Sequence, residues 1–273
     1  MEDYKSYGQN SFNLPHDLVQ LPTGGIFYKS KKKSVKVGYL TAADENIILG
    51  SLNNNVKDGV VLSLLRNKLF EPDLRPEELL TGDIEAILIF LRNTSFGFEY
   101  TIGLTDPATK EKFNHTVLLD EINIKKCEHK PNEQGFFEVT LPKSGMKAKL
   151  KPMNMFDTMD IDRMVNEYPA GRVAPKVSWR LNKQIISLND NEDRGFISQS
   201  IETLPIGDSK FIRNFLNDNE PSLDLKRVAI APSGEKVEFD INFGVEFFRP
   251  FFWLYQIFSR PILLSSEVPS YFV

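Results

Sequence analysis

The residues best suited to metal or nucleophilic chemistry are three histidines and one cysteine. Cys127 and His129 stand on either side of Glu128, which is the nearest approach to a pair of metal ligands. A tetrahedral zinc site needs four ligands. His16 and His115 are not at ligand spacing from this pair, nor from each other. We therefore expect no metal site, and we interpret the segment as a solvated linker ahead of a proline.

Acidic residues raise two further possibilities. The run from Asn189 to Asp193 suggests a calcium loop, but the EF-hand pattern counted from Asp190 requires Glu where the chain has Ile201. Four aspartates could in principle serve acid–base catalysis, yet each stands where an apolar run predicts the start of a helix. Binding of unpaired backbone N–H groups explains all of them without chemistry, and we predict a capping role for Asp44, Asp83, Asp157 and Asp208.

Two common catalytic motifs are also missing. The pair Gly24-Gly25 leads into a lysine-rich stretch, whereas a phosphate-binding loop should open a helix. The chain has no Gly-x-Ser-x-Gly sequence of the kind that places a serine nucleophile. We therefore expect a protein that is not an enzyme, with no cofactor and no small-molecule substrate.

One basic cluster could contact nucleic acid. It contains Lys29, Lys31 to Lys33 and Lys36, with only Tyr28 as an accompanying aromatic residue. Phosphate binding by such a cluster is opposed by the formal net charge of -4 and a pI of about 5.6. We favour a charged hairpin tip or an edge strand protected by lysines, and keep a nucleic-acid-binding module as the less favoured alternative.

An aromatic run near the C-terminus is the best candidate for a protein interface. Aromatic residues and arginine are the types enriched at interface hot spots. The alternative is a segment that closes the core of its own chain, which is the commoner place for phenylalanine. The interface prediction covers Phe247, Phe248, Arg249, Pro250, Phe251, Phe252 and Trp253.

Composition is that of a globular protein of one or two domains. The 273 residues are 41% hydrophobic and 26% charged. A single cysteine excludes an intramolecular disulfide and fits a reducing compartment. The N-terminus lacks the pattern of a signal peptide, and no apolar stretch approaches the ~20 residues that span a bilayer. We expect a soluble cytosolic product without membrane contact.

The elements that would position these residues are of mixed type, and they recur. A Pro-Gly turn at 21–25 precedes alternating residues at 35–39, which predict a strand. Apolar periodicity then predicts helices from Thr41, over 60–70 and over 84–93, the last ending near Gly97. Two strand-like segments around 105–109 predict a hairpin over 100–119.

The second half repeats these signals in the same order. A turn at 141–145 lies 120 residues after the first, and strand 147–152 and a helix from Asn154 follow it. Gly207-Asp208 and Pro232 each lie 125 residues after their counterparts, the latter in a second hairpin over 228–239. We predict an α+β fold made of two diverged copies, each with a β-hairpin, short helices and a second, zinc-ribbon-like hairpin.

Four segments follow from this prediction. A flexible N-terminal arm over 1–16 precedes repeats at 17–127 and 131–256, and an extension over 257–273 ends the chain. The stretch from Val173 to Leu188, which contains Trp179, has no counterpart in the first repeat. One continuous α+β domain is the alternative.

Several of these short sequences resemble one known family. It is that of the baseplate hub and hub-assembly proteins of contractile-tailed (myovirus-type) bacteriophages. The resemblance runs from about Leu18 to Pro250 and depends on the order of its moderately specific motifs. They are Leu21-Pro22-Thr23-Gly24-Gly25 with Leu40 to Glu45, Leu79 to Asp83 with Arg92 and Ser95-Phe96-Gly97, Leu204 to Asp208, and Val245 to Pro250.

The resemblance implies a structural or assembly role without enzymatic activity. The expected partners are other phage baseplate or tail proteins, and the expected location is the virion tail after assembly in the host cytoplasm. A transient assembly chaperone that leaves the virion is the alternative. Many similar proteins carry cysteine knuckles suited to zinc in both hairpins, whereas this chain has Thr105 to Thr109 and Ala231 to Gly234. Zinc is therefore not expected, and strand pairing with packing of Phe113 or Phe239 must hold the hairpins.

Overall fold

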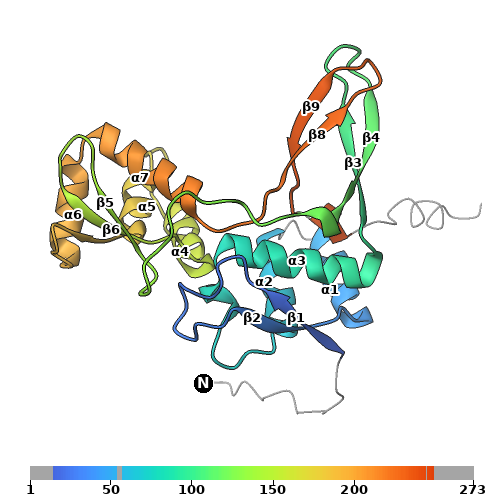
Figure 1. Cartoon of the computed structure of the whole chain (residues 1–273), viewed down its shortest axis with the longest axis horizontal. Coiled ribbons are helices and arrows are strands. Elements are labelled where there is room, and N and C mark those ends of the chain that lie inside the picture. The colour runs from blue at the N-terminus through green and yellow to red at the C-terminus, as the bar shows by residue number, and fades with distance from the viewer. Residues whose placement is uncertain (1–14, 54–56, 244, 249–273) are drawn as a thin grey trace, which may run out of the picture.

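The computed structural model describes residues 15–53, 57–243 and 245–248. It has two lobes, with a pair of β-hairpins projecting from the first (Figure 1). Most of the predicted arm over 1–16 and the whole predicted extension over 257–273 lie outside the described residues. The mixture of helices with small antiparallel sheets confirms the predicted α+β class.

The first lobe packs three helices against a two-stranded sheet. The antiparallel strands place Val19 opposite Val35, and the side chains of Val35 and Val37 are fully buried. The predicted strand and helices are therefore confirmed, whereas the first strand was not predicted. The elements are β1 (His16–Gln20), β2 (Ser34–Gly38), α1 (Ala42–Asn53), α2 (Lys57–Lys68), the short η1 (Pro76–Glu78) and α3 (Thr81–Phe96).

Helix α3 is the central element of this lobe. Its buried face carries Ile87, Leu88 and Leu91 at helical spacing, which explains why the segment is helical. It ends at Gly97, as predicted, because this residue has φ 82°, a left-handed conformation that glycine adopts without a Cβ clash.

The second lobe packs four helices against a three-stranded sheet. The strands run in the order β5-β6-β7, all antiparallel to their neighbours, over a core that includes Leu150, Ile185 and Ile212. The strand β7 belongs to the stretch for which the sequence showed no counterpart. The elements are β5 (Phe137–Thr140), β6 (Lys147–Leu150), α4 (Met155–Asn166), α5 (Lys176–Gln184), β7 (Ile185–Leu188), α6 (Arg194–Thr203) and α7 (Ile206–Asn219).

Two hairpins from different parts of the chain lie side by side, and together we call them the arm (Figure 1). Both were predicted. The first consists of β3 (Glu99–Thr105) and β4 (Lys112–Leu118), and the second of β8 (Lys226–Ile230) and β9 (Lys236–Asp240). No ladder of hydrogen bonds joins the two hairpins, so they meet through side chains, as the ring contact of His115 on β4 with Phe239 on β9 shows.

The chain crosses between the lobes twice, and the two crossings are paired. Ile124 and Leu223 form an antiparallel bridge, and the N–H of Lys125 donates to the carbonyl of Ser222 at 2.9 Å. After the second hairpin the chain re-enters the core of the first lobe with Ile241 and with Phe247 of the short helix η3 (Val245–Phe248). The predicted second repeat therefore contributes residues to the first core, and the duplication itself stays a prediction.

The four aspartates occupy the same position in their helices but have two different roles. Each is the third residue of its helix. Asp44 accepts the backbone N–H of Thr41, and Asp157 forms a capping box with Asn154, so the predicted capping role is confirmed for both. For Asp83 and Asp208 it is wrong, because their helices start after residues that form no side-chain cap.

Asp83 and Asp208 instead bind the two Pro-Gly turns. The Asp83 carboxylate accepts the N–H and hydroxyl of Thr23 at 3.0 and 2.6 Å, together with the hydroxyl of Tyr28. Asp208 accepts the N–H groups of Lys143 and Ser144 at 2.7 and 2.8 Å. The same link between a turn and a helix start therefore occurs once in each half of the chain.

Candidate interaction surfaces

The two described phenylalanines of the predicted aromatic interface lie inside the protein. Phe247 has 0% of its surface exposed, and its ring packs edge-on against Tyr100 and Phe248. The Arg92 guanidinium lies 5.5 Å from the centre of the same ring. Phe247 and Phe248 thus pack in the core of their own chain, which was the alternative to the interface prediction. The other five residues (Arg249, Pro250, Phe251, Phe252 and Trp253) lie outside the described residues, where the interface prediction is untested.

The outer surface of the arm exposes apolar side chains. On β8, Val228 is 53% and Ile230 is 60% exposed, although both are β-branched residues that usually pack. Between them Ala229 faces the first hairpin and is buried. Apolar residues on both faces are typical of a strand that is covered on both sides. That feature of the sequence could have drawn attention to this strand.

The tips of the two hairpins are joined by one carboxylate. Asp106 in the first tip accepts the N–H groups of Ala108 and Thr109, and also the N–H and hydroxyl of Ser233 in the second tip at 3.0 and 2.8 Å. Burial disfavours its charged form, but these hydrogen bonds outweigh that effect and hold the pKa of Asp106 below its usual value. The predicted metal-free hairpins therefore have a polar link besides their strand pairing.

Replacement of Asp106 by alanine is expected to separate the tips while leaving each hairpin formed. The N–H of Ser233 loses its acceptor, so its amide hydrogen exchange should accelerate at least about tenfold. Hydrogen exchange followed by NMR measures this, with Asp240→Ala on exposed β9 as the control. Unchanged exchange at Ser233 in Asp106→Ala would show that the link does not hold the tips.

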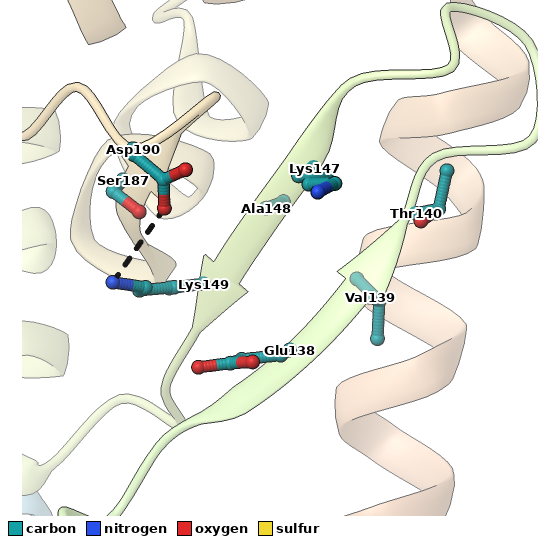
Figure 2. Close-up of a pocket in the computed structure, with 8 residues that line it drawn as sticks. All are labelled: Glu138, Val139, Thr140, Lys147, Ala148, Lys149, Ser187 and Asp190. Carbon is teal, nitrogen blue, oxygen red and sulfur yellow. Dashed lines mark ion pairs between the residues drawn. The ribbon is translucent and has the colours of Figure 1, made fainter.

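A polar hollow of about 370 Å³ lies on the exposed face of the β5-β6-β7 sheet (Figure 2). Lys149 and Asp190 form an ion pair across it at 3.8 Å. The hydroxyl of Ser187 is buried beside this pair and has no hydrogen-bond partner among the described residues. Groups of both charges suit a polar group of a partner protein. The lining residues are Glu138, Val139, Thr140, Lys147, Ala148, Lys149, Ser187 and Asp190.

A second hollow, of about 380 Å³, runs along the outer side of α3 and is largely apolar. Ile89 and Phe90 of the helix form its floor together with Phe98, which is exposed although it is aromatic. Such a groove suits an apolar side chain of a neighbouring protein. The remaining lining residues are Val19, Gln20, Ala86, Asn93, Thr94, Leu119, Asp120, Ile122 and Leu223.

The basic cluster lies in the connection between β1 and β2, except for Lys36, which is on β2, and this is the charged hairpin that was predicted. Two of its lysines are engaged within the chain. The Lys31 ammonium donates to the carbonyls of Ile26 and Glu133 at 2.6 and 3.0 Å, and Lys32 forms an ion pair with Glu71. These contacts reduce the charge available to phosphate and do not favour the nucleic-acid alternative.

Two carboxyl groups lie where the lobes meet. Glu85 is on α3, and Glu220 follows the end of α7. Burial raises the pKa of Glu85 to about 7, and burial together with the charge of Glu85 raises the pKa of Glu220 to about 7. One oxygen of each carboxyl is buried without a hydrogen-bond partner among the described residues. The junction therefore keeps these carboxyls partly protonated at neutral pH.

Stability is expected to fall as the pH rises from about 5 to about 7. In this window the native protein keeps protons on Glu85 and Glu220 that the unfolded chain has released, so unfolding becomes easier. Glu220→Gln should flatten this dependence and stabilise the protein by about 1–2 kcal/mol at pH 8. Urea denaturation at pH 5 and pH 8 measures both effects, with exposed Glu238→Gln as the control. If the stability of Glu220→Gln fell with pH as steeply as that of the wild type, the raised pKa assigned to Glu220 would be contradicted.

The remaining candidates for chemistry do not assemble into a site. His129 packs its ring on Phe215 and its backbone N–H donates to the side-chain oxygen of Asn219, while Cys127 lies half-buried in the connection. In the part of the chain that the structure describes, no three His, Cys, Asp or Glu side chains gather as metal ligands would. None of the helices within the described ranges is long and apolar enough to cross a membrane.

Comparison with known proteins identifies a family for this chain. The model of the family described as T4 bacteriophage base plate protein matches residues 26–248, which include the first lobe apart from β1, the second lobe and both hairpins. No curated protein and no solved structure matches the chain.

Proposed function

The chain belongs to the family of T4 bacteriophage base plate proteins, and on that premise we propose that it is a structural component of the hub region of a phage tail baseplate. In this role it acts by binding neighbouring tail proteins, without catalysis and without a cofactor. Its place is the virion tail, after assembly in the host cytoplasm.

The observation that carries this proposal is the length of the family match, which spans 223 residues from 26 to 248. Surfaces of the described residues support it. The arm projects from the body with exposed Val228 and Ile230, and an apolar groove follows α3. Exposed apolar surface of this kind marks contacts with other proteins. The polar hollow beside Ser187 offers a further contact of different chemistry.

Tail fractionation tests the structural role. Virions and tail intermediates of the phage that encodes the chain would be purified and analysed by mass spectrometry and immunoblotting. A structural component should be present in mature baseplates at a fixed ratio to the other tail proteins. If it occurred only in tail intermediates and never in virions, the role would be that of a transient assembly chaperone.

The hub location needs a separate experiment. A nonsense mutation in the gene would be made, and the assembly products would be separated by sedimentation. Loss of central hub complexes with intact peripheral complexes would support the hub assignment. Loss of the peripheral complexes alone would contradict it while leaving baseplate membership intact.

A further inference from the structure

Within the described residues, no strand pairs with the edge of β3 that points away from β4. The N–H of Leu119 donates to the carbonyl of Phe98, and that of Asp106 to the carbonyl of Glu111, both at 2.9 Å. Because these pairs alternate in an antiparallel ladder, the backbone groups of the odd-numbered residues of β3 point away from β4. Arg92 uses the carbonyl of Glu99. The edge thus presents the N–H and C=O groups of Thr101, Gly103 and Thr105, all exposed.

This edge lacks the devices that protect exposed strands from pairing. Natural edges are commonly protected by charges, prolines or bulges. Strand β9 carries Lys236, Glu238 and Asp240 at its free edge, and β4 carries Lys112. Strand β3 has no charge after Glu99, no proline, and a regular seven-residue register with β4. It is therefore suited to receive another strand.

Gly103 gives a second, independent indication. Glycine in the middle of a strand costs roughly 0.5–1 kcal/mol relative to alanine. Nothing among the described residues requires it here, because its φ is not positive, and an added Cβ would come no closer than 4.0 Å to the side chain of Asn114. An unrequired glycine within a strand often marks the close approach of another backbone.

We propose that β3 pairs with β3 of a second copy of this chain, about a two-fold axis at Gly103. In this register Thr101 of each copy exchanges both backbone hydrogen bonds with Thr105 of the other, and the two Gly103 residues exchange theirs, so the N–H and C=O groups of these three residues are satisfied. Ile102 of each copy then lies opposite Leu104 of the other. Both side chains are half-buried in the single chain, and the pairing covers them further.

The position of the neighbouring strand β8 is compatible with pairing of two β3 strands about a two-fold axis at Gly103. The second hairpin packs on the first with β9 against β4 through Phe239 and His115, so in this stacking β8 is the strand on the side of β3. The exposed side chains of Val228 and Ile230 are on β8, and its free edge is uncharged beyond Lys226. Val228 and Ile230 face away from the first hairpin, so they lie outside the β3–β3 ladder, and the pairing meets no charged row beyond Lys226 on the nearby edge of β8. The less charged side of the arm thus becomes the interface.

Sedimentation equilibrium of the full chain tests the pairing. The mean mass should rise from that of the 31.2 kDa monomer toward twice that value as the concentration increases through the micromolar range. Over the same range, amide hydrogen exchange should slow at Thr101, Gly103 and Thr105. A chain that stays monomeric at every concentration, or free exchange of these amides in the dimer, would overturn the proposal.

A charge at the two-fold axis gives the sharpest variant. Gly103→Lys places two ammonium groups opposite each other, and the open space around Gly103 lets the single chain fold normally. The dissociation constant should rise about tenfold or more. Asn114→Lys is the matched control, since it adds the same charge to the same face but one strand farther from the axis, where salt screens it. Equal dimerisation of Gly103→Lys and wild type would overturn the proposal.

Discussion

Phe247→Ala is expected to destabilise the protein by about 3–5 kcal/mol, the range for removing a buried aromatic ring. Phe247 is fully buried, and its ring contacts Tyr100 of the arm, Phe243 and Phe248, and the buried guanidinium of Arg92. The cavity would lie where helix α3, the arm and the returning chain meet. Chemical denaturation followed by circular dichroism measures the loss.

The matched control is Phe156→Ala on α4. Phe156 is 57% exposed, so its removal should change the stability by no more than about 0.5 kcal/mol. A small effect at Phe247 with loss of binding to tail proteins would instead support an interface role for this residue. A large effect at Phe156 would show that exposure does not predict the cost of truncation in this fold.

Asp83→Ala is expected to cost about 3 kcal/mol at neutral pH. The change leaves the N–H of Thr23 and the hydroxyls of Thr23 and Tyr28 without their acceptor inside the protein, and burial of such groups is costly. Tyr28 would still accept the N–H of Leu80, so the turn should loosen before the helix does. Urea denaturation gives the loss, and hydrogen exchange at Thr23 locates it.

Two variants separate the loss of the Asp83 hydrogen bonds from the loss of a negative charge. Asp120→Ala removes an exposed carboxylate and should change the stability by less than about 0.5 kcal/mol. Asp208→Ala removes the corresponding link in the second lobe, where the acceptor serves two backbone N–H groups. Its effect should be smaller than that of Asp83→Ala, because Asp83 also serves two buried hydroxyls. The reverse order would contradict this account.

Local signals in the sequence predicted much of the fold. Apolar periodicity placed α1, α2 and α3, and alternating residues with turn chemistry placed both hairpins. These signals act within a few residues, so they can be read without the tertiary structure. For the same reason the capping role was right for Asp44 and Asp157, whose partners lie three residues away.

The errors concern partners that are distant in the sequence. Asp83 binds Thr23, 60 residues earlier, and no local pattern distinguishes that role from a cap. Phe247 and Phe248 were ambiguous because an aromatic run looks the same in a core and at an interface. The polar hollow beside Ser187 depends on a strand, β7, that the sequence did not reveal. The predicted duplication and its boundaries stay predictions, which superposition of 17–125 on 131–256 would test.

The link between the hairpin tips also affects how the protein is made. Asp106 and Ser233 are 127 residues apart, so a ribosome needs roughly 6–25 s between delivering the first and the second. During that interval the first hairpin has neither its companion nor the returning Phe247. A nascent chain therefore displays an uncovered sheet while the second lobe is still being translated. In a cell that produces many copies at once, neighbouring polysomes bring such chains together, so a lower level of expression should increase the soluble yield.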